Sequence, residues 1–146
     1  MKKILLLIFL SSNLKAVVYA QPANDTPHIE IKYVDPNLTS KTDISCEKFE
    51  TSFDKADYKN YTVVDSFLLS KLKEAYENIS YYKEPADIDV RYKLSINFTG
   101  KEKMPLVVCV DKAGEAMING QSVRSEKFFR LLKKTIALVP REFSIK

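Results

Sequence analysis

The chain is poor in the residues on which catalytic and cofactor sites usually depend. Its 146 residues include three glycines, two cysteines and one histidine. Three isolated glycines cannot build a glycine-rich phosphate-binding loop, and two cysteines with one histidine cannot complete an ordinary zinc site without carboxylates. Nucleophilic catalysis requires a base oriented by a third group, and the spacing around His28 suggests none. We therefore predict no catalytic residue, no metal and no cofactor.

Paired carboxylates are the catalytic pattern that the composition leaves open. Asp87 and Asp89 are two positions apart, so on a strand their side chains would share a face. Such a pair could act as acid and base in a hydrolase. The same residues also suit a solvated strand entrance, which we favour because nothing in the sequence indicates a cleft around them. A carboxylate-based hydrolase remains an alternative function.

Long apolar runs are also scarce. The longest, Ile4–Leu10, follows a positively charged start and precedes small residues before Gln21. This layout is typical of a secretory signal peptide, whereas a membrane-spanning helix needs about 20 mostly apolar residues. We predict an exported protein, periplasmic or secreted, with no membrane contact after cleavage. The expected divisions are a signal peptide over 1–20, a flexible leader over 21–27 and a single domain over 28–146.

Cleavage of the signal peptide would leave almost no net charge. The remaining 126 residues hold 20 basic and 19 acidic side chains, so the strong positive field that favours nucleic acids is missing and we expect no nucleic-acid partner. Residues 21–90 carry a net charge of −6 and residues 91–146 one of +7. We expect the two halves to fold against each other so that their charges interleave. A basic binding face is the alternative that we consider less favoured.

The two cysteines, Cys46 and Cys109, are expected to form a disulfide. An even cysteine count in an exported chain favours a bridge. Closing 63 positions would contribute up to ~4 kcal/mol in the chain-entropy model. Two separate buried thiols are the alternative.

Hydrophobic periodicity predicts the secondary structure. Apolar and polar residues alternate in several short segments, and two further segments show the three- and four-residue apolar spacing of amphipathic helices capped by Asp65 and Ser125. Each glycine falls at an expected turn. The expected strands cover 28–34, 44–53, 88–98, 105–110 and 116–118, and the expected helices 65–79 and 125–139. We therefore predict an α+β fold of order β-β-α-β-β-β-α, in which an antiparallel sheet of four to five strands carries both helices on one face.

A recognition surface is the remaining candidate site. Several tyrosines flank the first expected helix, and tyrosine is enriched at binding hot spots. A polar strand face adds two cationic side chains, although such a face is more often merely solvated. The candidate binding residues are Tyr58, Tyr61, Tyr81, Tyr82, Arg91 and Lys93.

Three short motifs carry a resemblance to known proteins. They are Ile44-Ser45-Cys46-Glu47-Lys48-Phe49-Glu50, Asp87-Ile88-Asp89-Val90-Arg91 and Ile118-Asn119-Gly120. With them the chain resembles small exported proteins of Bacteroidetes-type bacteria, over most of its mature length. The resemblance implies a bacterial origin and no activity.

Without a catalytic set, the first functional hypothesis is a non-catalytic binding module with a protein partner, of the inhibitor or immunity kind. A structural envelope subunit that self-associates through a sheet edge is the other non-enzymatic alternative.

Overall fold

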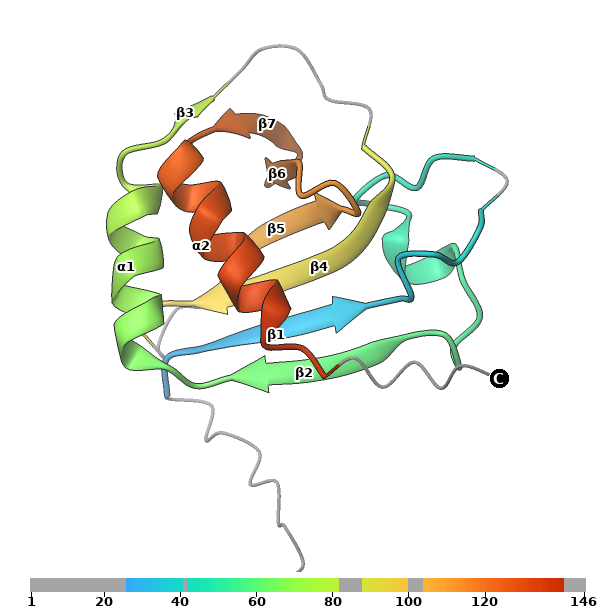
Figure 1. Cartoon of the computed structure of the whole chain (residues 1–146), viewed down its shortest axis with the longest axis horizontal. Helices are drawn as coiled ribbons and strands as arrows, with labels where there is room; N and C mark the ends of the chain where they lie inside the picture. Colours follow the sequence, from blue (N-terminus) through green and yellow to red (C-terminus); the bar gives the residue numbers. More distant parts are fainter. Residues whose placement is uncertain (1–25, 41, 82–87, 100–103, 141–146) are drawn as a thin grey trace, which may run out of the picture.

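The structure, a computed structural model, describes residues 26–40, 42–81, 88–99 and 104–140. The expected signal peptide and most of the expected leader lie outside these residues. In the described part, seven strands form one antiparallel sheet, and two helices cover one of its faces (Figure 1). The predicted α+β class is therefore confirmed. None of the helices in this part is long and apolar enough to span a membrane.

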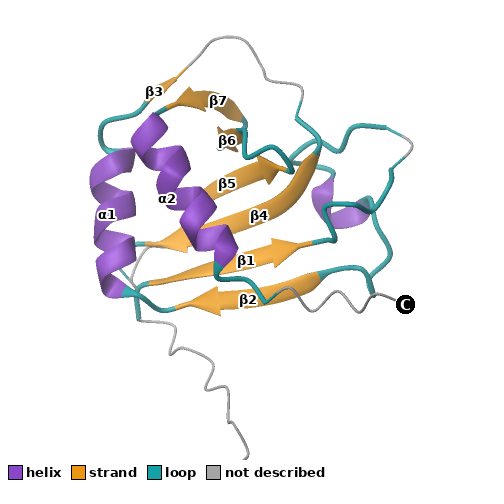
Figure 2. Cartoon of the chain, viewed as in Figure 1, coloured by secondary structure: helices purple, strands orange, loops and turns teal. Residues whose placement is uncertain are grey.

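The strand order across the sheet is β2-β1-β4-β5-β6-β7-β3 (Figure 2). The predicted strands 88–98, 105–110 and 116–118 correspond to β4, β5 and β6, which form a meander that β7 continues. Strand β1 lies between β2 and β4. The strands are β1 (His28–Tyr33), β2 (Lys59–Val63), β3 (Ser80–Tyr81), β4 (Val90–Asn97), β5 (Leu106–Asp111), β6 (Ala116–Ile118) and β7 (Gln121–Arg124). The helices are the 3-10 turn η1 (Phe49–Thr51), α1 (Ser66–Tyr76) and α2 (Glu126–Ala137).

Both helices begin at the residues predicted to cap them. The Asp65 carboxylate accepts the backbone N–H of Leu68 at 3.0 Å, and the Ser125 hydroxyl accepts that of Phe128 at 3.2 Å. These bonds satisfy donors that a helix start otherwise leaves unpaired. The helices press an apolar stripe against the sheet, through buried Leu69, Leu72 and Ala75 in α1 and buried Phe128, Leu132 and Thr135 in α2. Two apolar residues near the start of α1, Val64 and Phe67, are exposed instead.

The predicted turns after β5 and β6 are present. Gly114, Asn119 and Gly120 have φ angles of +91°, +48° and +79°. Asn-Gly with both residues at positive φ matches the twist of a two-residue hairpin, and it joins Ile118 directly to its partner Gln121. The third glycine of the chain lies outside the described residues.

The predicted strand over 44–53 is wrong. That segment forms turns and η1, while the edge strand is β2, in a stretch outside the predicted strands. Ile44, Cys46 and Phe49 are buried all the same, because the segment folds onto the sheet face opposite the helices. The predicted count of four to five strands is too low because β3 and β7 are also present, and both are short and mostly exposed.

Two apolar cores result, one on each face of the sheet. The alternation in β5 separates them: Val108 and Val110 face the helices, whereas Cys109 faces the opposite side. Burial on both faces explains why all residues of β5 before its last, Asp111, are apolar. The smaller core lies under a loop layer, which we define as residues 34–40 and 42–58.

Candidate functional site

The loop layer is tied to the sheet by a disulfide and by backbone hydrogen bonds. Cys46 and Cys109 form the predicted bridge, with their Cα atoms 5.7 Å apart. The backbone N–H of Val34 donates to the carbonyl of Arg91 at 3.1 Å, and that of Val90 donates to the carbonyl of Ile44 at 2.9 Å. The loop layer is therefore a fixed second wall of the domain.

Three aromatic rings fill the loop layer. The rings of Phe49, Phe53 and Tyr58 meet edge to face at 5.5–6.2 Å between centroids, the geometry that aromatic pairs prefer. The Tyr58 hydroxyl donates to the carbonyl of Phe49, and the backbone N–H of Phe53 donates to that hydroxyl at 3.3 Å. Tyr58 thus packs inside the layer, and the Lys32 ammonium lies 5.1 Å from its ring centre.

A β-bulge brings Arg91 under the loop layer. The pairing of β4 with β5 shifts between Val90 and Tyr92, which leaves Arg91 as the extra residue. Val90 consequently belongs to the loop-side core, whereas Leu94 and Ile96 belong to the helix-side core. The alternation of apolar and polar residues predicted for 88–98 is therefore wrong at the start of this strand. The predicted solvated position of Arg91 is wrong as well, because this residue is only 3% exposed.

Arg91 is held by an ion pair and by an aromatic ring. Its Nη2 donates to Oδ2 of Asp89 at 2.5 Å and to the Ser40 hydroxyl at 3.4 Å. Its guanidinium carbon lies 5.4 Å from the centre of the Phe53 ring. The other Asp89 oxygen accepts the backbone N–H of Ile44 at 3.1 Å. The remaining nitrogens of Arg91, Nε and Nη1, are buried and have no hydrogen-bond partner among the described residues.

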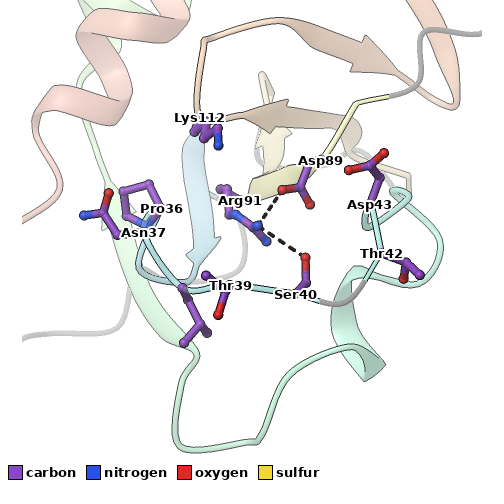
Figure 3. A pocket seen from close by; sticks show the side chains of 10 residues that line it. Pro36, Asn37, Thr39, Ser40, Thr42, Asp43, Asp89, Arg91 and Lys112 are labelled. Atoms are coloured by element: carbon purple, nitrogen blue, oxygen red, sulfur yellow. Dashed lines mark hydrogen bonds and ion pairs between the residues drawn. The ribbon is translucent and has the colours of Figure 1, made fainter.

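A polar pocket of about 490 Å³ opens beside this ion pair (Figure 3). Most of its wall is formed by loop residues 36–40, 42 and 43. Its inner side is formed by Asp89 and Arg91, and its rim by Lys112 from the β5–β6 turn. Hydroxyl and charged groups therefore surround a buried cation. We call this site the Arg91 pocket.

A second polar pocket lies on the same face of the sheet, beyond η1. Lys32 on β1 and Lys93 on β4 are directly paired across the strands, and two like charges in that position repel each other. Glu50 of η1 reaches between them, with its oxygens 3.1 Å from the Nζ of Lys32 and 2.6 Å from the Nζ of Lys93. We call these three residues the lysine bridge. They line a pocket of about 490 Å³ together with Glu30 and Ser95.

The hydrogen bond from Lys93, and then that from Lys32, lower the pKa of Glu50. The carboxylate is therefore charged in the folded protein over a wider pH range than in the unfolded chain. Because the folded-state pKa is the lower one, the stabilisation is complete above the unfolded value of 4.5 and is lost as pH falls through the folded pKa.

Replacing Glu50 by glutamine is expected to destabilise the domain at neutral pH. The side chain is 48% exposed, so solvent screening limits the loss to about 1 kcal/mol or less. Urea unfolding of the wild type and Glu50→Gln should give different midpoints at pH 7 that converge as the pH falls through the lowered folded-state pKa of Glu50. Glu30→Gln, on the same sheet face, is the matched control and should change stability less. A Glu50→Gln difference that stays constant down to acid pH would contradict the electrostatic explanation.

The structure does not gather the predicted tyrosines into one surface. Tyr58 lies in the loop layer, and half-buried Tyr61 pairs with Ile31 on the helix side of the edge strand β2. Tyr81 is on β3, at the opposite edge of the sheet. Partial burial and a hydrogen bond with Tyr76 raise the pKa of Tyr81 to about 12. Tyr82 lies outside the described residues.

Of the six predicted binding residues, Arg91 and Lys93 are the pair that the structure places together. They are two positions apart on β4. Arg91 lines the Arg91 pocket, and Lys93 belongs to the lysine bridge. The sequence analysis missed the contribution of Glu50, because nothing in its local pattern shows that η1 folds back over β1 and β4. It also missed Ser40 and Lys112. The opposite charges of Asp89 and Arg91, two positions apart, were the one available signal for the ion pair.

Asp89 and His28 are engaged in structural contacts. Both oxygens of Asp89 hold hydrogen bonds, and Asp87 lies outside the described residues. The Nδ1 of His28 is 2.6 Å from the carbonyl of Thr26, and its Nε2 is 3.6 Å from Glu30. Across residues 26–140, apart from the undescribed gaps, no group of three or more metal-ligating side chains is placed to hold an ion.

The arrangement as a whole is suited to binding. Two polar pockets lie side by side along β4, and ion pairs and a stapled loop hold their side chains in place. Comparison with protein-family models, with curated proteins and with solved structures finds no match to this chain.

Proposed function

We propose that the protein is a small exported, non-catalytic binding module that recognises a protein partner, as inhibitor or immunity proteins do. The observation that carries the proposal is the row of cationic groups on one sheet face. This row consists of Lys32 on β1 and of Lys93 and Arg91 on β4. Glu50 holds both lysines, and Asp89 holds Arg91. The proposed partner presents an acidic surface to this row.

The preorganisation of the row supports binding. Cross-strand lysines repel each other, and Glu50 compensates by holding both in one geometry. Complementary charges steer the encounter and give specificity. Groups that are fixed before association also lose less side-chain entropy on binding, which raises affinity. The row lies on central strands and not on a terminal segment, which is the kind of support that a precise recognition site requires.

The disulfide supports export. Bridges form and persist in oxidising compartments such as the periplasm and the extracellular space. Cys46 and Cys109 are both buried, so the bridge belongs to the folded domain and is not a surface contact between chains.

Removal of the two lysines is expected to weaken partner capture. The chain, expressed from its full-length gene with a C-terminal tag, is used to capture and crosslink proteins from an envelope extract. The wild type should retain a specific partner. The variant Lys32→Ser/Lys93→Ser should capture about tenfold less of it, because two charge-assisted contacts are removed.

The matched control is Lys73→Ser/Lys134→Ser, which removes the same charge from exposed positions of α1 and α2. It should retain the partner as the wild type does. Equal capture by all three proteins would overturn the proposed surface, and repeated failure to recover any partner would overturn the proposed function.

A further inference from the structure

Arg91 has hydrogen-bonding capacity that the described protein groups do not use. Its side chain is 4% exposed, yet Nε and Nη1 lack partners within the described ranges. A buried charged donor without an acceptor is unfavourable. Nη2, the remaining nitrogen, is taken by Asp89 and Ser40.

Asp89 does not supply the missing acceptors in the structure. Its Oδ2 accepts from Nη2 of Arg91, and its Oδ1 accepts from the backbone of Ile44. Arg91 lines the Arg91 pocket, and Figure 3 shows it between Asp89 and Ser40 at the inner side of that space. A ligand oxygen in the pocket can reach the free nitrogens once the guanidinium, which lines that space, turns toward it.

The charges around the pocket define the ligand. Arg91 and Lys112 contribute two positive charges, and Asp43 and Asp89 two negative ones. Asp43 and Asp89 repel a doubly charged phosphate about twice as strongly as a singly charged carboxylate. A carboxylate oxygen is also a strong acceptor for a guanidinium N–H. The hydroxyls of Thr39, Ser40 and Thr42 can bond polar groups beside it.

We propose that the Arg91 pocket binds a carboxylate group of the partner protein, an inference that rests on the proposed function. The carboxylate comes either from a chain terminus or from an aspartate or glutamate side chain. Arg91 is its main ligand, and Lys112 at the rim attracts it. Nε and Nη1 are covered in the structure, so the guanidinium rotates slightly on binding while Nη2 stays with Asp89.

The test follows the Nε–Hε signal of Arg91 in NMR spectra of the ¹⁵N-labelled chain. Arg91→Lys identifies this signal by its disappearance. Three probes are titrated: a tripeptide of alanine with a free C-terminus, its amidated and acetylated form, and the same blocked peptide with a central glutamate. Inorganic phosphate is the fourth. We expect saturable shifts with the free or the glutamate peptide, which identifies the source of the carboxylate, and none with the blocked alanine peptide.

Lys112→Met should weaken carboxylate binding by about tenfold without disturbing the core, and Lys134→Met on α2 should leave it unchanged. This rim variant keeps the inference testable if Arg91→Lys fails to fold. Equal shifts with the blocked alanine peptide, shifts with phosphate alone, or no shift with any probe would overturn it. Absent carboxylate binding with intact partner capture overturns this inference alone. Carboxylate binding without partner capture overturns the proposed function.

Discussion

Replacing both Cys46 and Cys109 by alanine is expected to lower the free energy of unfolding by ~4 kcal/mol. The bridge closes 63 positions, and constraining a loop of that length removes chain entropy from the unfolded state by roughly this amount. For a domain of this size the loss corresponds to a fall in melting temperature of about 15 °C. Urea unfolding and thermal melts followed by circular dichroism measure both quantities.

Reduction supplies the control for this prediction. The wild type treated with a reducing agent should unfold at nearly the same midpoint as the double alanine variant, and the variant should not respond to the reductant. The loop layer carries Ser40 and Glu50, so both polar pockets should lose their binding when the staple is absent. If the double alanine variant lost less than about 1 kcal/mol in free energy of unfolding, packing without the disulfide would be enough to hold the loop layer in place.

Replacing Asp89 by alanine is expected to destabilise the protein by about 3–5 kcal/mol, because it leaves the buried Arg91 charge without its counterion. Arg91→Met should have a smaller effect. The methionine can pack against Phe53, and Asp89 keeps its hydrogen bond from Ile44 and is 22% exposed to water. Denaturant unfolding of the two single variants measures the asymmetry.

The double variant Asp89→Ala/Arg91→Met tests the same explanation independently. It should be more stable than Asp89→Ala alone, since it removes the unpaired charge as well as its partner. Equal losses in both single variants, or a double variant whose loss is the sum of the two, would contradict the assignment of Asp89 as the counterion.

Local chemistry explains why much of the fold could be predicted. The caps at Asp65 and Ser125, the Asn119-Gly120 turn and the apolar β5 depend on residues within a few positions of one another. Such features follow from backbone sterics and from the burial of one stripe or one face. The prediction failed over 44–53, where apolar residues are buried by packing onto a distant strand and not by pairing in the sheet.

The candidate site depends on contacts that are distant in sequence. Glu50 reaches lysines 18 and 43 positions away, and Ser40 meets Arg91 across 51 positions. The bulge that buries Arg91 leaves no trace in the alternation of its strand, because Ile88 and Val90 are apolar whichever face they occupy. The described tyrosines of the predicted surface, Tyr58, Tyr61 and Tyr81, are distributed over both faces and both edges of the sheet.

The sequence by itself determined the α+β class, both helix starts, the turns and the pairing expected of the two cysteines. Each of these follows from short-range sterics, from hydrophobic periodicity or from an even cysteine count. Only the tertiary structure decided that a stapled loop covers the second sheet face, that Arg91 is buried with Asp89, and that Glu50 joins two strands. The reason is physical: an ion pair forms where folding places two side chains within about 4 Å, and that proximity depends on the packing of distant segments.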